Sequence, residues 1–144
     1  RRTEIMTRQE MFDIAAKHLL TQRVRSVDPV TGSCRYRGSQ GRMCAIGPMI
    51  PDEKYSPDME GRGVGSCDVW NAMGLDSGDR GNLMTLAHKL QDIHDASAPT
   101  AWPYMLLTLA LEYNLNTAMV HHCANAMIRE DSRFSQHNPK VQEP

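Results

Sequence analysis

The chain has few aromatic residues and no long apolar run. Phenylalanine occurs 2 times, whereas methionine occurs 10 times. Flexible methionine side chains fill irregular gaps in a core, so we expect them to do much of the packing that aromatic rings do elsewhere. The longest apolar run, from Met105 to Leu111, is interrupted by Thr108 and is much shorter than the roughly 20 residues of a membrane-spanning helix. The sequence therefore predicts no membrane partner.

The sequence also lacks a strong net charge and the residue spacings typical of metal or phosphate sites. Its formal net charge is -1, which gives no general attraction to nucleic acid or to an anionic membrane. The cysteines and histidines show no Cys-x-x-Cys or His-x-x-x-His spacing. Gly61-Arg-Gly-Val-Gly65 lacks the lysine of a phosphate-binding loop. We therefore expect neither a metal nor a cofactor.

All four cysteines are interpreted as reduced thiols of a cytoplasmic protein. No secretory signal is recognised in the sequence, and scattered cysteines are typical of reducing compartments. Pairing of two strands could bring Cys34 and Cys44 together, but the compartment disfavours a disulfide between them.

The length of 144 residues suits one domain with a single hydrophobic core. Residues 6–131 are predicted to form this domain. Residues 1–5 precede the first methionine and are interpreted as an upstream extension or an added remnant. Residues 132–144 have almost no apolar content and are predicted to be disordered.

Helical periodicity is the clearest structural signal. Thr7-Arg-Gln-Glu10 is a capping box, and apolar residues follow at helical spacing up to about Arg23. A short helix is predicted at 67–75 and ends at a glycine. Longer helices are predicted at 79–95, from about 100 to 114, and from Asn116 onward.

The glycine-rich segment between the first two helices is predicted to be extended. Two short arms, at 34–36 and 43–45, flank Gly38-Ser-Gln-Gly41. Arms of this kind around a glycine loop favour a β-hairpin, with Arg35 and Arg37 on one face. The predicted fold class is α+β, a mostly helical single domain with a short antiparallel β-hairpin packed on a helical bundle.

Several short motifs follow one another along the chain. They are Cys34-x-Tyr36-Arg37-Gly38, Gly41-x-x-Cys44-Ala45-x-Gly47, Ile50-Pro51-Asp52-x-x-Tyr55, Met59-Glu60-Gly61 and Leu90-Gln91-x-x-His94-Asp95, and then Trp102. With this order of motifs, the chain up to about Leu115 resembles a group of short uncharacterised proteins from bacteriophages, prophages and bacterial genomes. Members of that group often have a second cysteine where Pro48 stands here. The resemblance implies a phage-associated protein but no particular activity.

The leading functional hypothesis is a non-enzymatic, phage-associated protein that binds a host macromolecule. We expect a host protein as the partner, as for an inhibitor of a defence or housekeeping system. Aromatic and arginine side chains often anchor protein interfaces. The predicted partner-binding residues are Arg35, Tyr36, Arg37 and Tyr55.

A second hypothesis is a cysteine-dependent enzyme centred on Cys44, with His94 as its base. Adjacent helical residues point about 100° apart, so Asp95 is not expected to orient the His94 ring. The alternative for Gln91 and His94 is structural, because both could hold the glycine-rich segment by hydrogen bonds.

A third hypothesis is a nucleic-acid-binding module. Arg35, Tyr36 and Arg37 could stack on bases and pair with phosphates, and Arg23 and Arg25 could extend the basic patch. Arg42 could extend it further. The sequence leaves all three hypotheses open.

Overall fold

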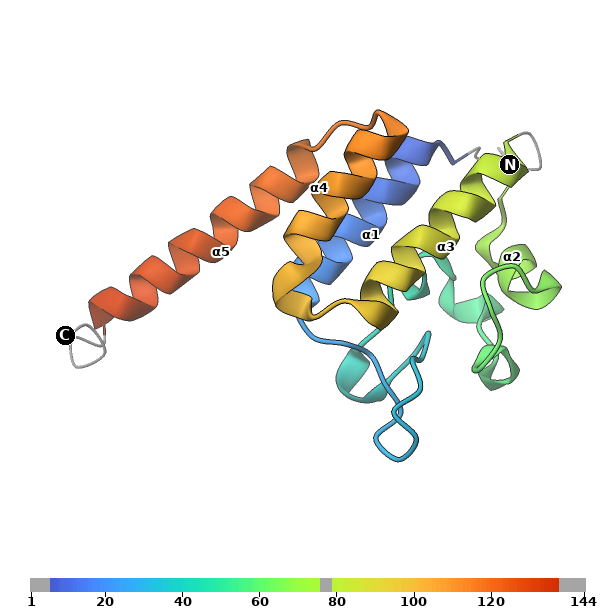
Figure 1. The fold of residues 1–144 in the computed structure, drawn as a ribbon. Coiled ribbons are helices and arrows are strands. Elements are labelled where there is room, and N and C mark those ends of the chain that lie inside the picture. Colours follow the sequence, from blue (N-terminus) through green and yellow to red (C-terminus); the bar gives the residue numbers. More distant parts are fainter. Residues whose placement is uncertain (1–5, 76–78, 138–144) are drawn as a thin grey trace.

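A computed structural model describes the backbone of residues 6–75 and 79–137. Its main body is a bundle of α1 (Arg8–Gln22), α3 (Arg80–Ala96), α4 (Trp102–Tyr113) and α5 (Ala118–His137) (Figure 1). Helix α1 is central, since it contacts the other three. Helix α2 (Cys67–Met73) and the segment before it lie on the opposite side of the bundle from α5 (Figure 1).

The predicted capping box begins α1. Thr7 Oγ1 accepts a hydrogen bond from the Glu10 amide at 3.1 Å, and Glu10 Oε1 accepts one from the Thr7 amide at 3.0 Å. The helix ends at Arg23, whose φ of 62° places it in the left-handed region and whose amide reaches the Leu19 carbonyl. The predictions for this helix are confirmed, because both local signals and the apolar stripe agree.

The remaining helices also occur where the periodicity predicts them. Helix α2 ends at Gly74 with φ 65°, and α4 ends at Asn114 with φ 55°. Helix α5 continues to His137, through the first residues of the segment that was expected to be disordered. Residues 138–144, and the proposed extension at 1–5, lie outside the described residues. None of the described helices is long and apolar enough to cross a membrane.

The core joins the bundle to the segment that precedes α2. Trp102 and Phe12 are its largest fully buried side chains. Its buried methionines come from both parts of the molecule, as their number in the sequence predicts: Met11, Met49, Met59 and Met73. Trp102 also donates its indole N–H to the Ile93 carbonyl at 3.0 Å, which satisfies its one polar atom.

The predicted β-hairpin is wrong. Residues 24–66, the irregular segment, contain short 3-10 turns, η1 (Ser39–Gly41), η2 (Gly47–Met49), η3 (Asp52–Lys54) and η4 (Pro57–Met59). Within residues 6–75 and 79–137 the structure has no β-strand, and its one isolated antiparallel bridge joins Val27 to Cys34. The fold is therefore helical rather than α+β.

The two predicted strands do not pair because side chains elsewhere capture their backbone groups. The Met43 amide donates to Gln22 Oε1 at 2.9 Å, and the Met43 carbonyl accepts from His18 Nε2 at 2.8 Å. The amides of Tyr36 and Arg37 instead donate to the Glu60 carboxylate. The two arms are thus bonded to α1 and to Met59-Glu60-Gly61, and few of their backbone groups remain for a ladder.

Candidate binding site

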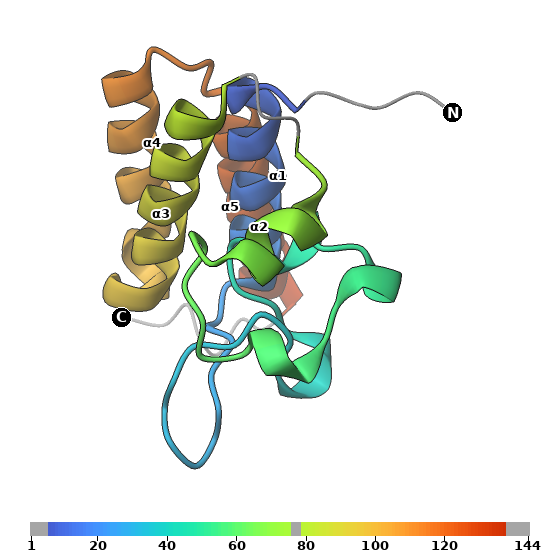
Figure 2. The ribbon, with the colours of Figure 1, turned by 90° about the vertical axis from the view of Figure 1, so that its right-hand side faces the viewer.

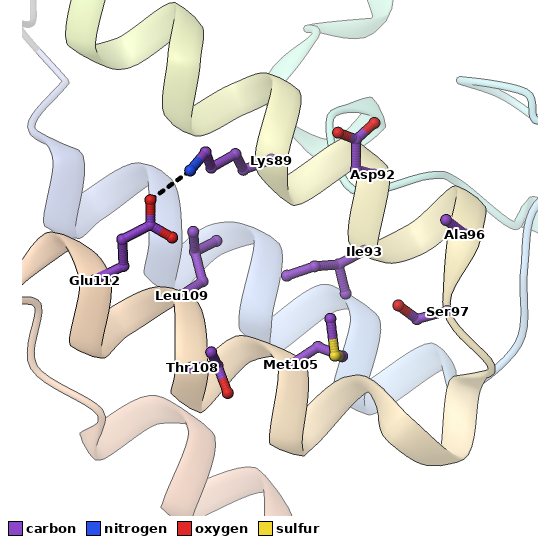
Figure 3. A pocket seen from close by; sticks show the side chains of 9 residues that line it. All are labelled: Lys89, Asp92, Ile93, Ala96, Ser97, Met105, Thr108, Leu109 and Glu112. Atoms are coloured by element: carbon purple, nitrogen blue, oxygen red, sulfur yellow. Dashed lines mark hydrogen bonds and ion pairs between the residues drawn. The ribbon is translucent and has the colours of Figure 1, made fainter.

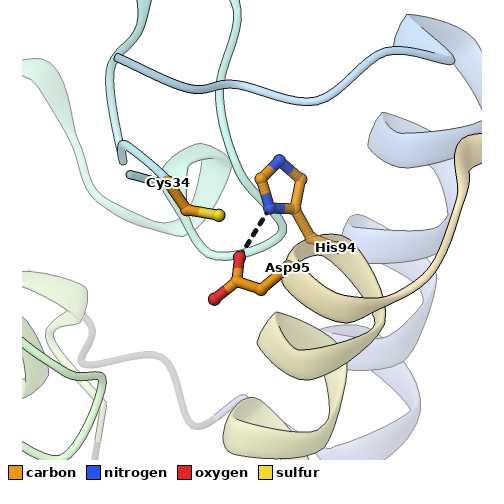
Figure 4. A group of neighbouring side chains, drawn as sticks. All are labelled: Cys34, His94 and Asp95. Carbon is orange, nitrogen blue, oxygen red and sulfur yellow. Dashed lines mark hydrogen bonds and ion pairs between the residues drawn. The ribbon is translucent and has the colours of Figure 1, made fainter. Parts of the chain in front are cut away.

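The last turn of α3 carries a buried histidine with both ring nitrogens engaged. His94 has no exposed surface, and its ring stacks on Trp102 with the ring centroids 5.7 Å apart. Its Nε2 accepts a hydrogen bond from the Ser26 amide at 2.9 Å. Because Nε2 is an acceptor, the proton of the neutral ring is on Nδ1. Nδ1 therefore donates to Asp95 Oδ1, 2.8 Å away (Figure 4).

The expectation that Asp95 would not orient the His94 ring is wrong. The angle of about 100° separates the directions in which the two side chains leave the helix axis. It does not fix the ends of the side chains, which turn toward each other and meet (Figure 4). The sequence argument failed because it considered Cβ directions alone.

Asp95 collects hydrogen bonds from several donors. Besides His94, it accepts from Gln91 Nε2 at 2.9 Å, and it is bonded to the Cys34 thiol. Burial alone would raise the pKa of Asp95, but these hydrogen bonds together hold it below its usual value. Asp95 is therefore an ionised acceptor at neutral pH.

Cys34, His94 and Asp95 have the side-chain types of a metal site, with ligand atoms within 4.8 Å of one another. The tautomer of His94 argues against a metal site. A metal on His94 Nδ1 would move the proton to Nε2, where it would face the Ser26 amide. The N–H groups of His94 and Ser26 would then face each other, and neither would have an acceptor in this buried position. The cluster fits a hydrogen-bonded link between α3 and the irregular segment better than it fits a metal.

Neither thiol in the glycine-rich motifs has the character of a nucleophile. Burial, together with the hydrogen bond and the charge of Asp95, raises the pKa of Cys34 to about 12. Burial also raises the pKa of Cys44 to about 12, outweighing the backbone N–H groups of Ile46 and Gly47 near its sulfur. A thiolate is the reactive form, so both groups are inert at neutral pH. Cys44 is fully buried, and among the described contacts none joins it to His94.

Glu60 is the second polar centre, and the sequence reasoning missed it. Its carboxylate accepts the Tyr36 amide at 2.9 Å, the Arg37 amide at 3.0 Å and the Tyr55 hydroxyl at 2.6 Å. A signal was available, because Glu60 stands between the apolar Met59 and a glycine. Met59 is buried, Gly61 has φ 81°, and the Glu60 side chain keeps only 12% of its surface exposed.

The residues predicted to bind a partner make contacts within the chain. Arg37 pairs with Asp52 at 2.6 Å and lies over the Tyr55 ring, 5.0 Å from its centroid. Arg35 pairs with Asp28 at 3.4 Å. The Tyr36 hydroxyl donates to the Arg62 carbonyl at 2.6 Å.

Two arginines of the wider basic patch are similarly occupied. Arg23 pairs with Glu130 at 3.0 Å. The Arg25 guanidinium donates to the carbonyls of His94 and Ser97 at the C-terminal end of α3, where a cation also complements the helix dipole. These two arginines therefore present no common surface for phosphates.

Among the residues that the structure describes, hollows lie on two sides of α3. The first, about 480 Å³, lies between α3 and the irregular segment. Its lining includes Cys34, Arg62, His88, Gln91, Asp92 and Asp95. Asp92 was not singled out from the sequence, and His88 was considered only as one of the histidines that could bind a metal. The spacing of both residues with Gln91 and Asp95 places all four along one side of α3.

The second hollow, about 260 Å³, lies between α3 and α4 (Figure 3). Ile93, Met105 and Leu109 give it an apolar floor, and the Lys89–Glu112 ion pair stands at its edge (Figure 3). Fewer polar residues line this hollow than line the first one. The sequence motifs contribute to it only through α3.

Comparison of the chain with protein-family models, with curated proteins and with solved structures found no match. The resemblance to the phage-associated group therefore stays a prediction from the motifs alone.

Proposed function

We propose that this is a non-enzymatic, phage-associated protein that binds a host protein through the loop at residues 28–33, the docking loop. The observation that carries the proposal is Val30, which is 90% exposed and lies in a loop that projects from the body of the molecule (Figures 1 and 2). An isolated exposed valine is ordinary, but one on a projecting and internally fixed loop can enter an apolar site of a partner without reordering the loop.

Hydrogen bonds fix the backbone of the docking loop. Asp28 Oδ1 accepts the amides of Val30 at 2.8 Å and Thr31 at 3.1 Å. Asp28 also exchanges backbone hydrogen bonds across the loop, to Ser33 at 2.7 Å and from Gly32 at 2.8 Å. A loop already held in one conformation loses little entropy when it binds, which favours affinity.

The enzyme alternative receives less support because both thiols in the motifs are held as neutral thiols. We expect iodoacetamide at neutral pH to modify the exposed Cys67 before Cys34, and Cys44 only after unfolding. Peptide mass spectrometry during the reaction follows each site. Fast modification of Cys44 that is lost in His94→Gln would favour the enzyme instead.

The nucleic-acid alternative also receives less support. Arg35, Arg37 and Arg23 are paired with Asp28, Asp52 and Glu130. Arg25 is bonded to backbone carbonyls, which leaves Arg42 as the one arginine of the patch without a described pairing. We expect no binding to duplex or single-stranded nucleic acid at physiological salt. Tight binding under those conditions would reverse the order of the two hypotheses.

The direct test places a photo-crosslinking amino acid at position 30 in the full chain. A second variant carries it at Tyr104, a 70% exposed residue on α4, as the matched control. We expect position 30 to crosslink one host protein that position 104 does not, and excess wild-type chain to prevent this. Excess Val30→Asp chain should compete poorly. The same products from both positions, or equal competition by Val30→Asp, would contradict the proposal.

A further inference from the structure

We infer that a second copy of this chain covers the outer face of α4, in a dimer whose two α4 helices pack antiparallel. The face is the α4 stripe, made of Tyr104, Thr108 and Leu111. Their spacing places all three on one side of the helix. Tyr104 is 70% exposed and Leu111 is 84% exposed, and Figure 2 shows α4 at the outer edge of the bundle. The inference does not depend on the proposed function.

The α4 stripe is apolar where a surface helix is normally polar. The inner side of α4 carries Trp102 and Leu106, which are buried in the core. A helix that is apolar all round is typically covered on every side, whereas α4 is covered by the described residues on its inner side only. Glu112 is the single charged residue of α4, and it forms an ion pair with Lys89 of α3. The exposed face therefore has the composition of a contact surface without net charge.

The polar side chain of the α4 stripe can be buried at little cost. Thr108 Oγ1 donates to the Tyr104 carbonyl at 3.0 Å, so the hydroxyl is hydrogen-bonded within the helix. Burial of a polar group costs free energy mainly when the group has no hydrogen bond to replace those with water. Thr108 is also smaller than its two neighbours in the stripe, which allows a second helix to approach closely at this point.

The arrangement of the stripe fits a second copy better than an unrelated partner. Tyr104 and Leu111 lie equally far from the midpoint of α4 (Trp102–Tyr113). A two-fold axis at this midpoint brings Tyr104 of each copy against Leu111 of the other, so the same aromatic–aliphatic contact forms twice. The two Glu112 residues lie toward opposite ends of the helix pair and do not meet. Recognition of an unrelated partner commonly uses complementary charges, and the stripe offers none.

The size of the surface predicts a weak dimer. Helix α4 has 12 residues and is therefore about 18 Å long. A dimer formed through one helix face of this length is near the lower limit of specific interfaces, about 1,000 Å² in total. We therefore expect monomer and dimer to be in an equilibrium that depends on protein concentration.

Sedimentation equilibrium of the purified full chain tests the inference. We expect the weight-average mass to rise from that of one chain toward that of two between about 1 μM and 1 mM. Leu111→Glu should weaken the dimer about a hundredfold, because both copies lose a buried leucine. Ile128→Glu is the matched control, since Ile128 is 66% exposed on α5, and it should leave the dimer unchanged. A monomer at every concentration, or equal weakening by the two variants, would overturn the inference.

Pairing of introduced cysteines tests the antiparallel arrangement. Tyr104→Cys and Leu111→Cys are made in separate chains that also carry Cys67→Ser, which removes the exposed thiol. Under air oxidation with copper phenanthroline, an equal mixture should form disulfide-linked dimers faster than either variant alone. The reason is that position 104 faces position 111, whereas identical positions lie about 10 Å apart along the helices. Faster pairing of Leu111→Cys with itself, or equal pairing in all three samples, would overturn the inference.

Discussion

The bundle and the irregular segment bury their backbones in different ways. In α1, α3 and α4 the backbone hydrogen bonds are local, and apolar stripes supply the packing. In residues 24–66 some amides close short turns, but several others donate to side chains of distant residues. Ser26 uses His94, Tyr36 and Arg37 use Glu60, and Met43 uses Gln22.

This difference changes what a single substitution can do. A truncated side chain in the bundle loses its own packing and leaves a cavity. A truncated polar centre in the irregular segment leaves several buried donors without acceptors, although each bond contributes little when intact. Few polar residues therefore hold this segment. Truncating one of them should lower the free energy of unfolding more than the size of the side chain suggests.

The largest expected effect is that of Glu60→Ala, at roughly 3–5 kcal/mol of lost unfolding free energy. Two backbone amides and the Tyr55 hydroxyl would lose their acceptor together. Urea denaturation measures the loss, with the exposed Glu53→Ala as the control, expected within about 0.5 kcal/mol of wild type. Leu86→Ala, in the bundle, should lose a similar 2–5 kcal/mol through its cavity. If Glu60→Ala lost less unfolding free energy than Glu53→Ala, polar side chains would not hold the irregular segment in the way described.

Next in size is His94→Ala, for which we expect a loss of about 2–4 kcal/mol. The Ser26 amide would lose its acceptor, and Trp102 would lose a stacked ring. His88→Ala is the matched control on the same helix, because His88 is exposed, and it should change stability little. Equal losses for the two histidines would mean that the buried link to Ser26 contributes nothing.

A smaller loss of unfolding free energy, about 1–3 kcal/mol, is expected for Gly47→Ala. A Cβ at Gly47 would lie 2.5 Å from the Tyr36 carbonyl oxygen, so the two parts of the irregular segment would have to separate. Gly63→Ala meets no atom within 4 Å and is the control. Thermal unfolding of both variants gives the difference, and a stable Gly47→Ala protein would show that these backbones do not need to approach closely.

The smallest effect concerns pH. Burial lowers the pKa of His18 and outweighs the hydrogen bond to the Met43 carbonyl, which raises it. The unfolded chain therefore takes up a proton first as the pH falls below about 6.5, and stability decreases. Stability contributed by this group is complete above that pH. Urea denaturation between pH 7.5 and 5 should show a shallower decline for His18→Gln. A rise in wild-type stability on acidification would contradict the assignment.

The sequence predicted the helices well because their signals are local. The Thr7 capping box and Gly74 at the end of α2 act within a few residues of the elements that they limit. The irregular segment could not be predicted in this way. Its conformation depends on Glu60 and His94, which are far along the chain from the amides that they bind. The glycine pattern suggested a hairpin because the same residues suit any tight backbone path.

The candidate site was predicted in part. Gln91, His94 and Asp95 were recognised from their motif, and the hydrogen bond between His94 and the Ser26 amide links α3 to the irregular segment. The described hydrogen bond of Gln91 goes to Asp95 on the same helix. The hollow beside them could not be predicted, because it forms only where α3 meets residues 33–36 and 61–64. Val30 carried no sequence signal beyond a turn, since exposure depends on the whole fold.

Amide hydrogen exchange of the native protein tests most directly whether polar side chains hold the irregular segment as firmly as the helices. The informative amides are Ser26, Tyr36 and Arg37, compared with Leu86 and Leu90 in α3. We expect protection within about tenfold of the α3 amides, which corresponds to about 1.4 kcal/mol. Exchange at nearly the unprotected rate for Tyr36 and Arg37, while α3 remains protected, would contradict the account.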